Sequence, residues 1–345
     1  MAGIVAAAAV DASSTKRKPG LMAWLVLLPL LAWLALFVVV PTAMLVAMSF
    51  AERDALGRIV WSANIDNYRR AVDWDTLVAL PRLLPENIGQ GIQTVVAEDS
   101  PDSPAPATLG QKIRGFGRGL VATFNTFLWF RIFLVSIWYA LLTTIICMVI
   151  GYPVAYFIGR SPERMRTILI TLVMIPFWTS FLIRTYAWIT ILSKEGLVNS
   201  FLVSAQIIPE PITILYTPFA SVLGLVYNYL PFMILPIYTS VERLDNALVE
   251  AAYDLGAGPV RAFSQVIIPL TRPGIVAGAL LVFVPSIAMF AITNLMGGGN
   301  TPTIGDVIYK QFTSGRNQPF GAALGTLLLF AFIVSLWLTR KQREE

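Results

Sequence analysis

Histidine is absent from the 345-residue chain, and cysteine occurs once, as Cys147 within an apolar run. The lack of histidine excludes His-based acid–base catalysis and His-ligated metal sites, and a single cysteine excludes a disulfide within the chain. Charge is also scarce, because charged residues make up 13% of the sequence, about half of their share in ordinary soluble domains. Hydrophobic residues make up 56%. These proportions indicate an integral membrane protein.

Several signatures of catalysis and ion coupling are also missing. The sequence has no Gly-x-x-x-x-Gly-Lys-[Ser/Thr] phosphate loop, so we do not expect this chain to bind ATP by that route. It has no Gly-x-Ser-x-Gly turn and no carboxylate pair within its apolar runs, which argues against a hydrolase or transferase. Within the spans predicted below, Arg184 is the one charged side chain, so a proton relay lacks its acids. We therefore expect a transport subunit that is not an enzyme; the alternative is an ion-coupled secondary transporter or a channel subunit.

Six apolar stretches are long enough to cross a bilayer core of about 30 Å, which needs about 20 helical residues. They cover residues 21–50, 132–158, 167–192, 215–240, 274–295 and 320–339. The run that contains the second stretch begins near Gly119 and would form a helix of about 60 Å if unbroken, so we expect a break at Arg131. The sequence predicts an all-α integral membrane protein with six transmembrane helices.

Basic residues in the short loops predict the orientation of these spans. Arginine and lysine are grouped in the N-terminal tail (1–20), in the loop after the second span, in the loop 241–272 and in the C-terminal tail. All four segments fall on one side of a six-span topology, so the positive-inside rule places both termini in the cytosol. The net charge of +5 is explained in the same way and does not indicate nucleic-acid binding.

Residues 51–131 are predicted to form a periplasmic or interfacial insertion. The sequence EDSPDSPAPA (98–107) has the composition of an extended, solvated linker. On either side lie LVALPRLLPENI and IRGFGRGLVATFNTFLWF, which we expect to form short helices along the membrane surface. Two interpretations stay open: a variable insertion that caps the outer face, or a docking site for an external partner.

The stretch EAAYDLGAGPVRAFSQVIIP (250–269) is polar and lies between long apolar runs. Asp245 is a plausible N-cap for a helix that ends at Gly256 or Gly258. Such a helix is about 15 Å long and cannot cross a bilayer. Glu250 and Asp254, four residues apart, would form an acidic ridge that a basic partner surface would stabilise. The alternative is a surface helix whose ridge is merely solvated.

The same stretch resembles the EAA loop of ATP-binding-cassette (ABC) importer permeases. Glu-Ala-Ala is followed after three residues by Gly, and after nine more by VIIP, with conservative replacements in the last element. In that family this short helix inserts into a cleft of a cytosolic ATPase and transmits nucleotide-driven motion to the spans. The resemblance therefore implies an ATPase-coupling role for the following residues: Glu250, Ala251, Ala252, Asp254, Gly256 and Pro269.

The resemblance extends from about residue 132 to the C-terminus. The stretches GYPVAYFIGR, FLIRTYAWITILSKEGLVN and YNYLPFMILPIY are similar to permeases of spermidine/putrescine-type importers. This implies a type I importer permease fold, 132–345, in the bacterial inner membrane, surrounded by lipid, with a short cytosolic coupling helix. It also implies an ATPase dimer that binds ATP and Mg, a second permease subunit that we expect to be a different chain, and a periplasmic substrate-binding protein. No cofactor is expected in this chain.

Polar and aromatic residues in three spans are candidates for the substrate path: Arg184, Tyr186, Trp188, Tyr227, Asn228, Met289 and Asn294. Arg184 could instead extend to lipid headgroups at the outer leaflet. Tyr227 could instead serve aromatic packing, whereas Asn228 in apolar surroundings would need a hydrogen-bond partner.

Polyamine permeases of this type tend to carry acids in the fifth span where this chain has Met289 and Asn294. Without those carboxylates a polycation loses strong compensation for its lost hydration. We expect a small polar solute of the polyamine, opine or amino-acid-like class. Within that class we hypothesise a neutral, zwitterionic or anionic cargo, unless the partner permease supplies the acids.

Overall fold

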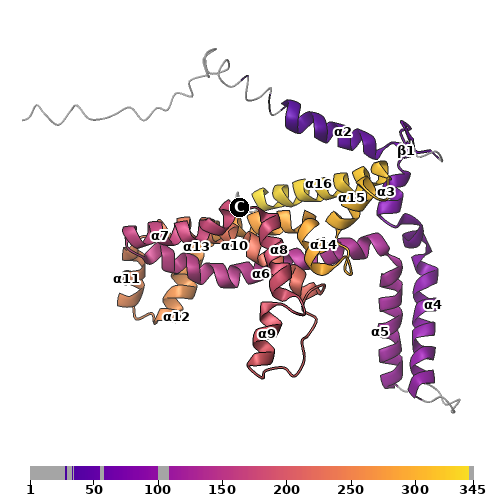
Figure 1. Ribbon diagram of the computed structural model, residues 1–345. Coiled ribbons are helices and arrows are strands. Elements are labelled where there is room, and N and C mark those ends of the chain that lie inside the picture. Colours follow the sequence, from indigo (N-terminus) through magenta and orange to yellow (C-terminus); the bar gives the residue numbers. More distant parts are fainter. Residues whose placement is uncertain (1–27, 29–32, 34, 55–57, 100–108, 342–345) are drawn as a thin grey trace, which may run out of the picture.

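The computed structural model describes residue 28, residue 33 and residues 35–54, 58–99 and 109–341. The expected N-terminal tail, much of the first span and most of the linker 98–107 lie outside this part of the chain. Helices dominate it: four long helices, α6 (Leu128–Arg160), α10 (Pro218–Glu242), α13 (Ile268–Ala288) and α16 (Gln318–Lys341), form the body of the molecule (Figure 1). The helix α2 (Val40–Ser49), preceded by a π-helical turn (Ala35–Val39), packs along α16.

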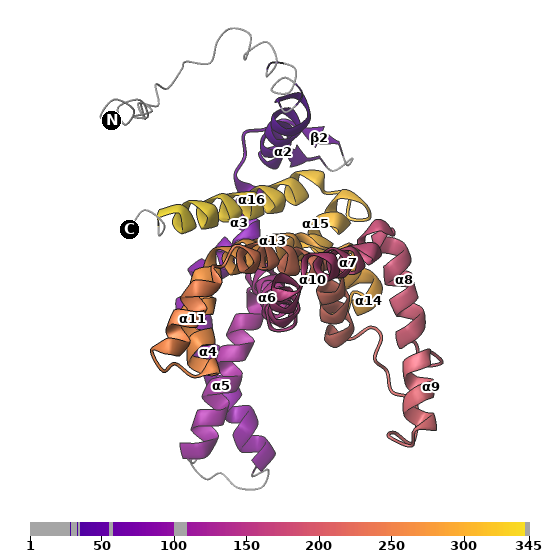
Figure 2. The same ribbon diagram turned by 90° about the vertical axis from the view of Figure 1, so that its left-hand side faces the viewer.

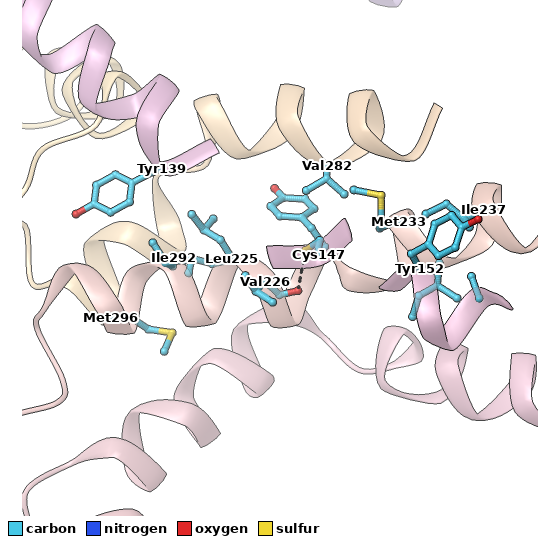
Figure 3. Close-up of a cluster of buried hydrophobic side chains, with 14 of the residues drawn as sticks. Tyr139, Cys147, Tyr152, Leu225, Val226, Met233, Ile237, Val282, Ile292 and Met296 are labelled. Carbon is cyan, nitrogen blue, oxygen red and sulfur yellow. Dashed lines mark hydrogen bonds between the residues drawn. The ribbon is translucent and has the colours of Figure 1, made fainter. Parts of the chain in front are cut away.

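The core lies where α6, α10 and α13 pack on one another. Cys147, Leu225 and Met233 are fully buried there, and Val282 of α13 joins them (Figure 3). Small residues let the helix backbones approach closely. A Cβ atom on Gly274 of α13 would lie 2.4 Å from the carbonyl oxygen of Pro236 in α10, so only glycine fits at this crossing.

The apolar helices fall in the six predicted span regions. In the described residues, α6, α10 and the rod Pro259–Ala288 are long and apolar enough to cross a membrane, and a bent pair raises the total to four. The segments Leu36–Ser49 and Gln318–Val334 are shorter apolar helices. This pattern is consistent with six spans, although length and composition alone support three or four.

The second predicted span begins earlier than expected. We predicted a break at Arg131, but α6 continues through this residue and starts at Leu128. The break falls at Phe127, whose backbone (φ −83°, ψ 72°) is not helical. Arg131 is compatible with the helix because it lies within one turn of its end.

The third predicted span is bent instead of straight. It consists of α7 (Glu163–Met174), a 3-10 turn (Ile175–Trp178) and α8 (Phe181–Leu192), followed by α9 (Leu197–Ser204), and the two halves meet at 87°. Pro176 lies in the 3-10 turn, and the next residues, Thr179 and Ser180, have extended backbones. Proline removes a helical hydrogen bond at this point, and the chain turns before α8 begins.

The fifth predicted span is shifted toward the N-terminus. The rod that contains it starts with α12 (Pro259–Ala262), continues through a π-helical turn (Phe263–Ile267) into α13, and ends at Ala288. The π turn comes just before Pro269, which has no N–H to donate to a helical hydrogen bond, and this gives a local reason for the wider turn. Beyond Ala288 the chain breaks at Met289 before the short helix α14 (Ala291–Gly297).

In its described residues, the insertion 51–131 forms a small β-hairpin followed by the helices α3, α4 and α5. The strands β1 (Glu52–Arg53) and β2 (Ile59–Val60) pair antiparallel, and α3 (Asp66–Ala71) follows. The two predicted surface helices form and are longer than expected: α4 (Trp74–Asp99) and α5 (Leu109–Thr126) lie side by side as a helical hairpin. Both views show the hairpin leaving the body at a steep angle to α6 (Figures 1 and 2).

Candidate coupling helix and substrate path

The helix α11 (Asn246–Asp254) stands at the end of the body opposite the α4–α5 hairpin (Figure 1). The helix begins with an N-cap: the Asp245 carboxylate accepts a hydrogen bond from the backbone N–H of Ala247 at 3.0 Å. The predicted N-cap is therefore present. None of the residues of α11 is buried.

Gly256 ends α11 in a way that requires glycine. Its φ is +80°, in the left-handed region that L side chains rarely adopt. The N–H of Gly256 donates to the carbonyl of Tyr253 at 2.9 Å, and the N–H of Ala257 donates to that of Ala252 at 3.0 Å. These two bonds form a Schellman motif, which satisfies carbonyls at the helix end and turns the chain toward α12.

An apolar surface remains uncovered around α11. Leu255 is 89% exposed and Val260 is 81% exposed, while Leu248 and Tyr253 are about half exposed. Glu250 of the same helix is also exposed. Large side chains of this kind, exposed together with acids at the end of a bundle, are typical of a surface that another protein covers.

Polar contacts connect α11 to the ends of the spans. The Arg160 guanidinium at the end of α6 donates to the Asn246 side chain in the first turn of α11. Nearby, Arg166 of α7 forms an ion pair with Glu242 at the end of α10. The first contact links α11 to a long helix, and the second holds the neighbouring helix ends together.

Arg184 of α8 packs inside the protein. It is 9% exposed, and its Nη1 donates to the carbonyl oxygen of Pro176 at 2.8 Å. Its guanidinium lies 5.8 Å from the ring centre of Phe177 and 5.9 Å from that of Tyr227. The interpretation that Arg184 extends to lipid headgroups is wrong, since its polar end is enclosed by a proline carbonyl and two aromatic rings.

The aromatic candidates separate into two groups. Trp188 of α8 and Tyr227 of α10 meet edge to face with ring centres 5.5 Å apart, which brings them to Arg184. Tyr186 points elsewhere and is 56% exposed. Asn228 is buried, and its side-chain amide donates to the Gly224 carbonyl of its own helix at 2.9 Å. The hydrogen-bond partner that Asn228 was expected to need therefore lies in its own helix, one turn away.

The two residues that replace the expected acids lie just beyond the C-terminal end of α13. Met289 forms the break after α13 and packs against the main core, and Asn294 lies in α14. A Cβ on Gly224 of α10 would lie 2.4 Å from the sulfur of Met296, so α14 is pressed against α10 one turn from Asn228. The structure therefore brings α8, α10 and α14 together, as their mutual packing confirms.

A buried carboxylate was missed by the sequence reasoning, which considered only the spans. Asp306 lies in the first turn of α15 (Ile304–Phe312) and is 1% exposed. Its Oδ2 accepts the N–H and hydroxyl of Thr303, at 3.0 and 2.8 Å, and the hydroxyl of Thr293 in α14 at 3.1 Å. The spacing of Thr303 and Asp306 is a readable capping box, which was the available signal.

The whole chain can now be compared with known proteins. A sequence profile of the family described as "Binding-protein-dependent transport system inner membrane component" matches residues 148–342, more than half of the chain. The chain belongs to this family. It is a multi-pass inner-membrane permease component of an ABC importer, not an enzyme, and the secondary-transporter alternative is rejected.

Curated relatives support this membership over nearly the full length. The permease is 37% identical over 324 residues to the "Spermidine/putrescine transport system permease protein PotB" of Salmonella typhimurium, covering 92% of this chain and 94% of the relative. It is 36% identical to the protein of the same name from Escherichia coli K12, covering 92% and 98%. Family membership implies an ATPase, a partner permease and a periplasmic binding protein.

Solved structures confirm the expected fold. The permease resembles a bacterial ABC transporter involved in the import of the acidic polysaccharide alginate, with a TM-score of 0.54 and 17% identity, over 94% of this chain and 95% of the other. It also resembles a chain of the bacterial alginate transporter in complex with a pentasaccharide-bound periplasmic protein, with a TM-score of 0.57 and 16% identity, over 94% of each chain. The all-α permease fold is thereby shown.

Proposed function

We propose that this permease carries a small polar solute from a periplasmic binding protein to the cytosol, and that α11 is the element on which a separate ATPase dimer acts. One observation carries the coupling role: α11 is capped at both ends, yet none of its residues is buried. A helix whose large apolar side chains are left exposed by the described part of its own chain is a candidate for covering by a partner surface. Glu250, Ala251, Ala252 and Asp254 lie on α11. Gly256 turns the chain at its end, and Pro269 lies in the first turn of α13.

This assignment implies an orientation. If α11 meets a cytosolic ATPase, the opposite end of the body, with the α4–α5 hairpin, faces the periplasm, and both termini lie in the cytosol. The partner permease is proposed to be a different chain. ATP and Mg belong to the ATPase in this arrangement, and this chain binds neither.

A crosslinking experiment tests the coupling surface. Cys147 is fully buried, so a cysteine introduced by Glu250→Cys is the preferred target of a thiol-reactive crosslinker. We expect Glu250→Cys to crosslink to the ATPase subunit in membranes of cells that express the whole transporter. Arg58→Cys, in the exposed segment before β2, is the control and stays unlinked. If Arg58→Cys reaches the ATPase and Glu250→Cys does not, both the coupling role and the orientation are wrong.

For the cargo, we propose a solute without several positive charges. Arg184 lies buried beside Trp188 and Tyr227, where α8 meets α10. A fixed cation enclosed by aromatic rings attracts a carboxylate and repels a polyamine, more strongly in a low-dielectric path than in water. Met289 and Asn294 supply no opposing charge. An opine- or amino-acid-like compound fits this set of side chains.

A polyamine is the second candidate, and the names of the relatives favour it. Under this alternative the partner permease would supply the acids, and Arg184 would serve only to hold α8 in place. Equilibrium binding to the cognate periplasmic protein separates the two candidates. Tight binding of an amino-acid-like compound, with weak binding of spermidine and putrescine, supports the first. The reverse result establishes the second.

A further inference from the structure

The α4–α5 hairpin is a rigid unit. A Cβ on Gly91 of α4 would lie 2.4 Å from the carbonyl oxygen of Gly115, and a Cβ on Gly119 would lie 2.3 Å from the Cα of Ile88. The two backbones are therefore in direct contact. The Asn87 amide adds a hydrogen bond of 3.0 Å to the Thr123 hydroxyl. Close backbone packing of this kind holds two helices at a constant distance and rotation.

The base of the hairpin is attached to the first turn of α6. The Asp73 carboxylate, just before α4, accepts the backbone N–H groups of Trp129 and Phe130 at 3.0 and 3.4 Å. A carboxylate at this place satisfies free N–H groups and complements the helix dipole. At the other side of the base, only Phe127 separates α5 from α6. The hairpin and the span are thus joined twice.

The length of α6 gives the depth of this joint in the membrane. Arg131 and Arg160 stand near opposite ends of one continuous helix. They are about 44 Å apart along it, at 1.5 Å per residue, which matches the bilayer thickness of about 40–45 Å when both headgroup layers are included. The two arginines therefore fit the two headgroup layers, and the α5 helix turns away from α6 at headgroup depth.

One side of α5 is apolar and uncovered. Leu109, Ile113, Phe116 and Leu120 recur at helical spacing, and their exposed fractions are 75%, 64%, 48% and 40%. The side of α5 that faces α4 carries Gln111, Gly115 and Gly119, so the apolar stripe points away from α4. In the described residues nothing packs on this stripe, although it extends over three turns.

The charged side chains of α5 are all basic. Lys112, Arg114 and Arg118 are exposed, and residues 109–126 contain no acid. At 100° per residue, Arg118 lies nearly opposite the apolar stripe, and Lys112 lies at its edge. An apolar stripe, a basic polar side and low overall hydrophobicity describe a helix that lies in a membrane interface.

We propose that the α4–α5 hairpin lies on the membrane face opposite α11 and inserts the Leu109–Leu120 stripe at the boundary between headgroups and acyl chains. The bilayer is the occupant because the hairpin starts at headgroup depth from a membrane span and because the helix that carries the stripe, α5, has basic side chains and no acid, which complements phosphate groups. The hairpin would brace the outer end of α6 against the lipid surface. This inference does not depend on which solute is carried.

Two cysteine positions at the same level of the hairpin test the proposal. The contacts of Gly91 with Gly115 and of Gly119 with Ile88 place Thr94 level with Ile113. Thr94 is exposed and lies on the flank of α4 away from the stripe, so Thr94→Cys is a matched control for Ile113→Cys. Because Cys147 is fully buried, a fluorescent thiol label is selective for the new site. The labelled full-length chain, purified with its partner subunits, is placed in nanodiscs of phosphatidylethanolamine and phosphatidylglycerol.

Quenching then reports the surroundings of each label. We expect a nitroxide attached near the lipid headgroup to quench the label at position 113 severalfold more than that at position 94, and iodide to show the opposite preference. Equal quenching of both sites by iodide means a solvated hairpin and overturns the proposal. Protection of position 113 from both quenchers means that a protein covers the stripe, and also overturns it. If Ile113→Cys does not assemble, Phe116→Cys replaces it with the same criteria.

Discussion

Replacing Gly256 with alanine isolates the contribution of one backbone angle to transport. Gly256 has φ +80°, and a Cβ added there meets no atom within 4 Å, so the substitution causes no clash. The cost is therefore confined to the left-handed conformation, about 1–2 kcal/mol for an L-residue. Such a cost shifts the equilibrium between the native and a rearranged end of α11 by a factor of roughly 5–30.

The chain contains a matched control two residues away. Gly258 also has open space where a Cβ would be added, but its φ is −72°, which alanine adopts freely. In proteoliposomes that contain the complete transporter, we expect Gly256→Ala to lower binding-protein-stimulated ATP hydrolysis and solute uptake together. Gly258→Ala should leave both within about twofold, since a compatible Gly→Ala change alters stability by about 0.4–1 kcal/mol.

Comparing Gly256→Ala with Gly258→Ala also shows whether folding of the spans or coupling to the ATPase fails. Because α11 is exposed, neither substitution should lower the unfolding temperature of the spans. Loss of uptake with an unchanged unfolding temperature places the defect in coupling. Equal effects of Gly256→Ala and Gly258→Ala, or full activity of Gly256→Ala, would refute the reasoning that the left-handed turn holds α11 in its working position.

Three further predictions concern the body and the hairpin joint. Asp73→Ala should destabilise the protein by about 1 kcal/mol through loss of a helix cap, whereas Asp73→Asn, which keeps an acceptor, should cost less; thermal unfolding in detergent measures both. Arg184→Met should cost about 0.5–1.5 kcal/mol, because it removes one of the hydrogen bonds to the partly buried Pro176 carbonyl, which keeps the N–H and hydroxyl of Thr179 as donors, and an unchanged unfolding temperature would show that this bond is dispensable. Gly274→Val should cost about 1–3 kcal/mol or more through overpacking against α10, with Gly110→Val on the open surface of α5 as a neutral control in the same unfolding assay.

Local signals in the sequence were sufficient for the coupling helix. Asp245 and Gly256 define the two ends of α11 through contacts within a few residues of themselves, and such contacts follow from residue type and spacing. The same holds for α10 and α16, whose described bounds, Pro218–Glu242 and Gln318–Lys341, lie within a few residues of the predicted limits. The two surface helices of the insertion were also predictable, although their lengths were underestimated.

The candidate substrate path was predictable only as a set of residue types. For Arg184 the sequence favoured lipid headgroups over the interior, because a residue's position along a span does not say which neighbours surround it. Asp306 was overlooked because its burial in the short helix α15 depends on α14 packing beside α15, far from any periodic pattern. Asn228 was expected to need a hydrogen-bond partner, but the sequence did not show that this partner is the Gly224 carbonyl of its own helix.

Composition, span lengths and the EAA pattern were enough to identify a membrane permease driven by a separate ATPase, because each of these signals depends on residues close together along the chain. The packing of the helices was needed to show that the third span bends by 87°, that Arg184 lies among aromatic rings, and that the hairpin joins α6 through Asp73. The physical reason is that burial and crossing geometry depend on which helices meet in space. Glycines such as Gly274 and Gly119 permit those meetings, but their partners are distant in the chain.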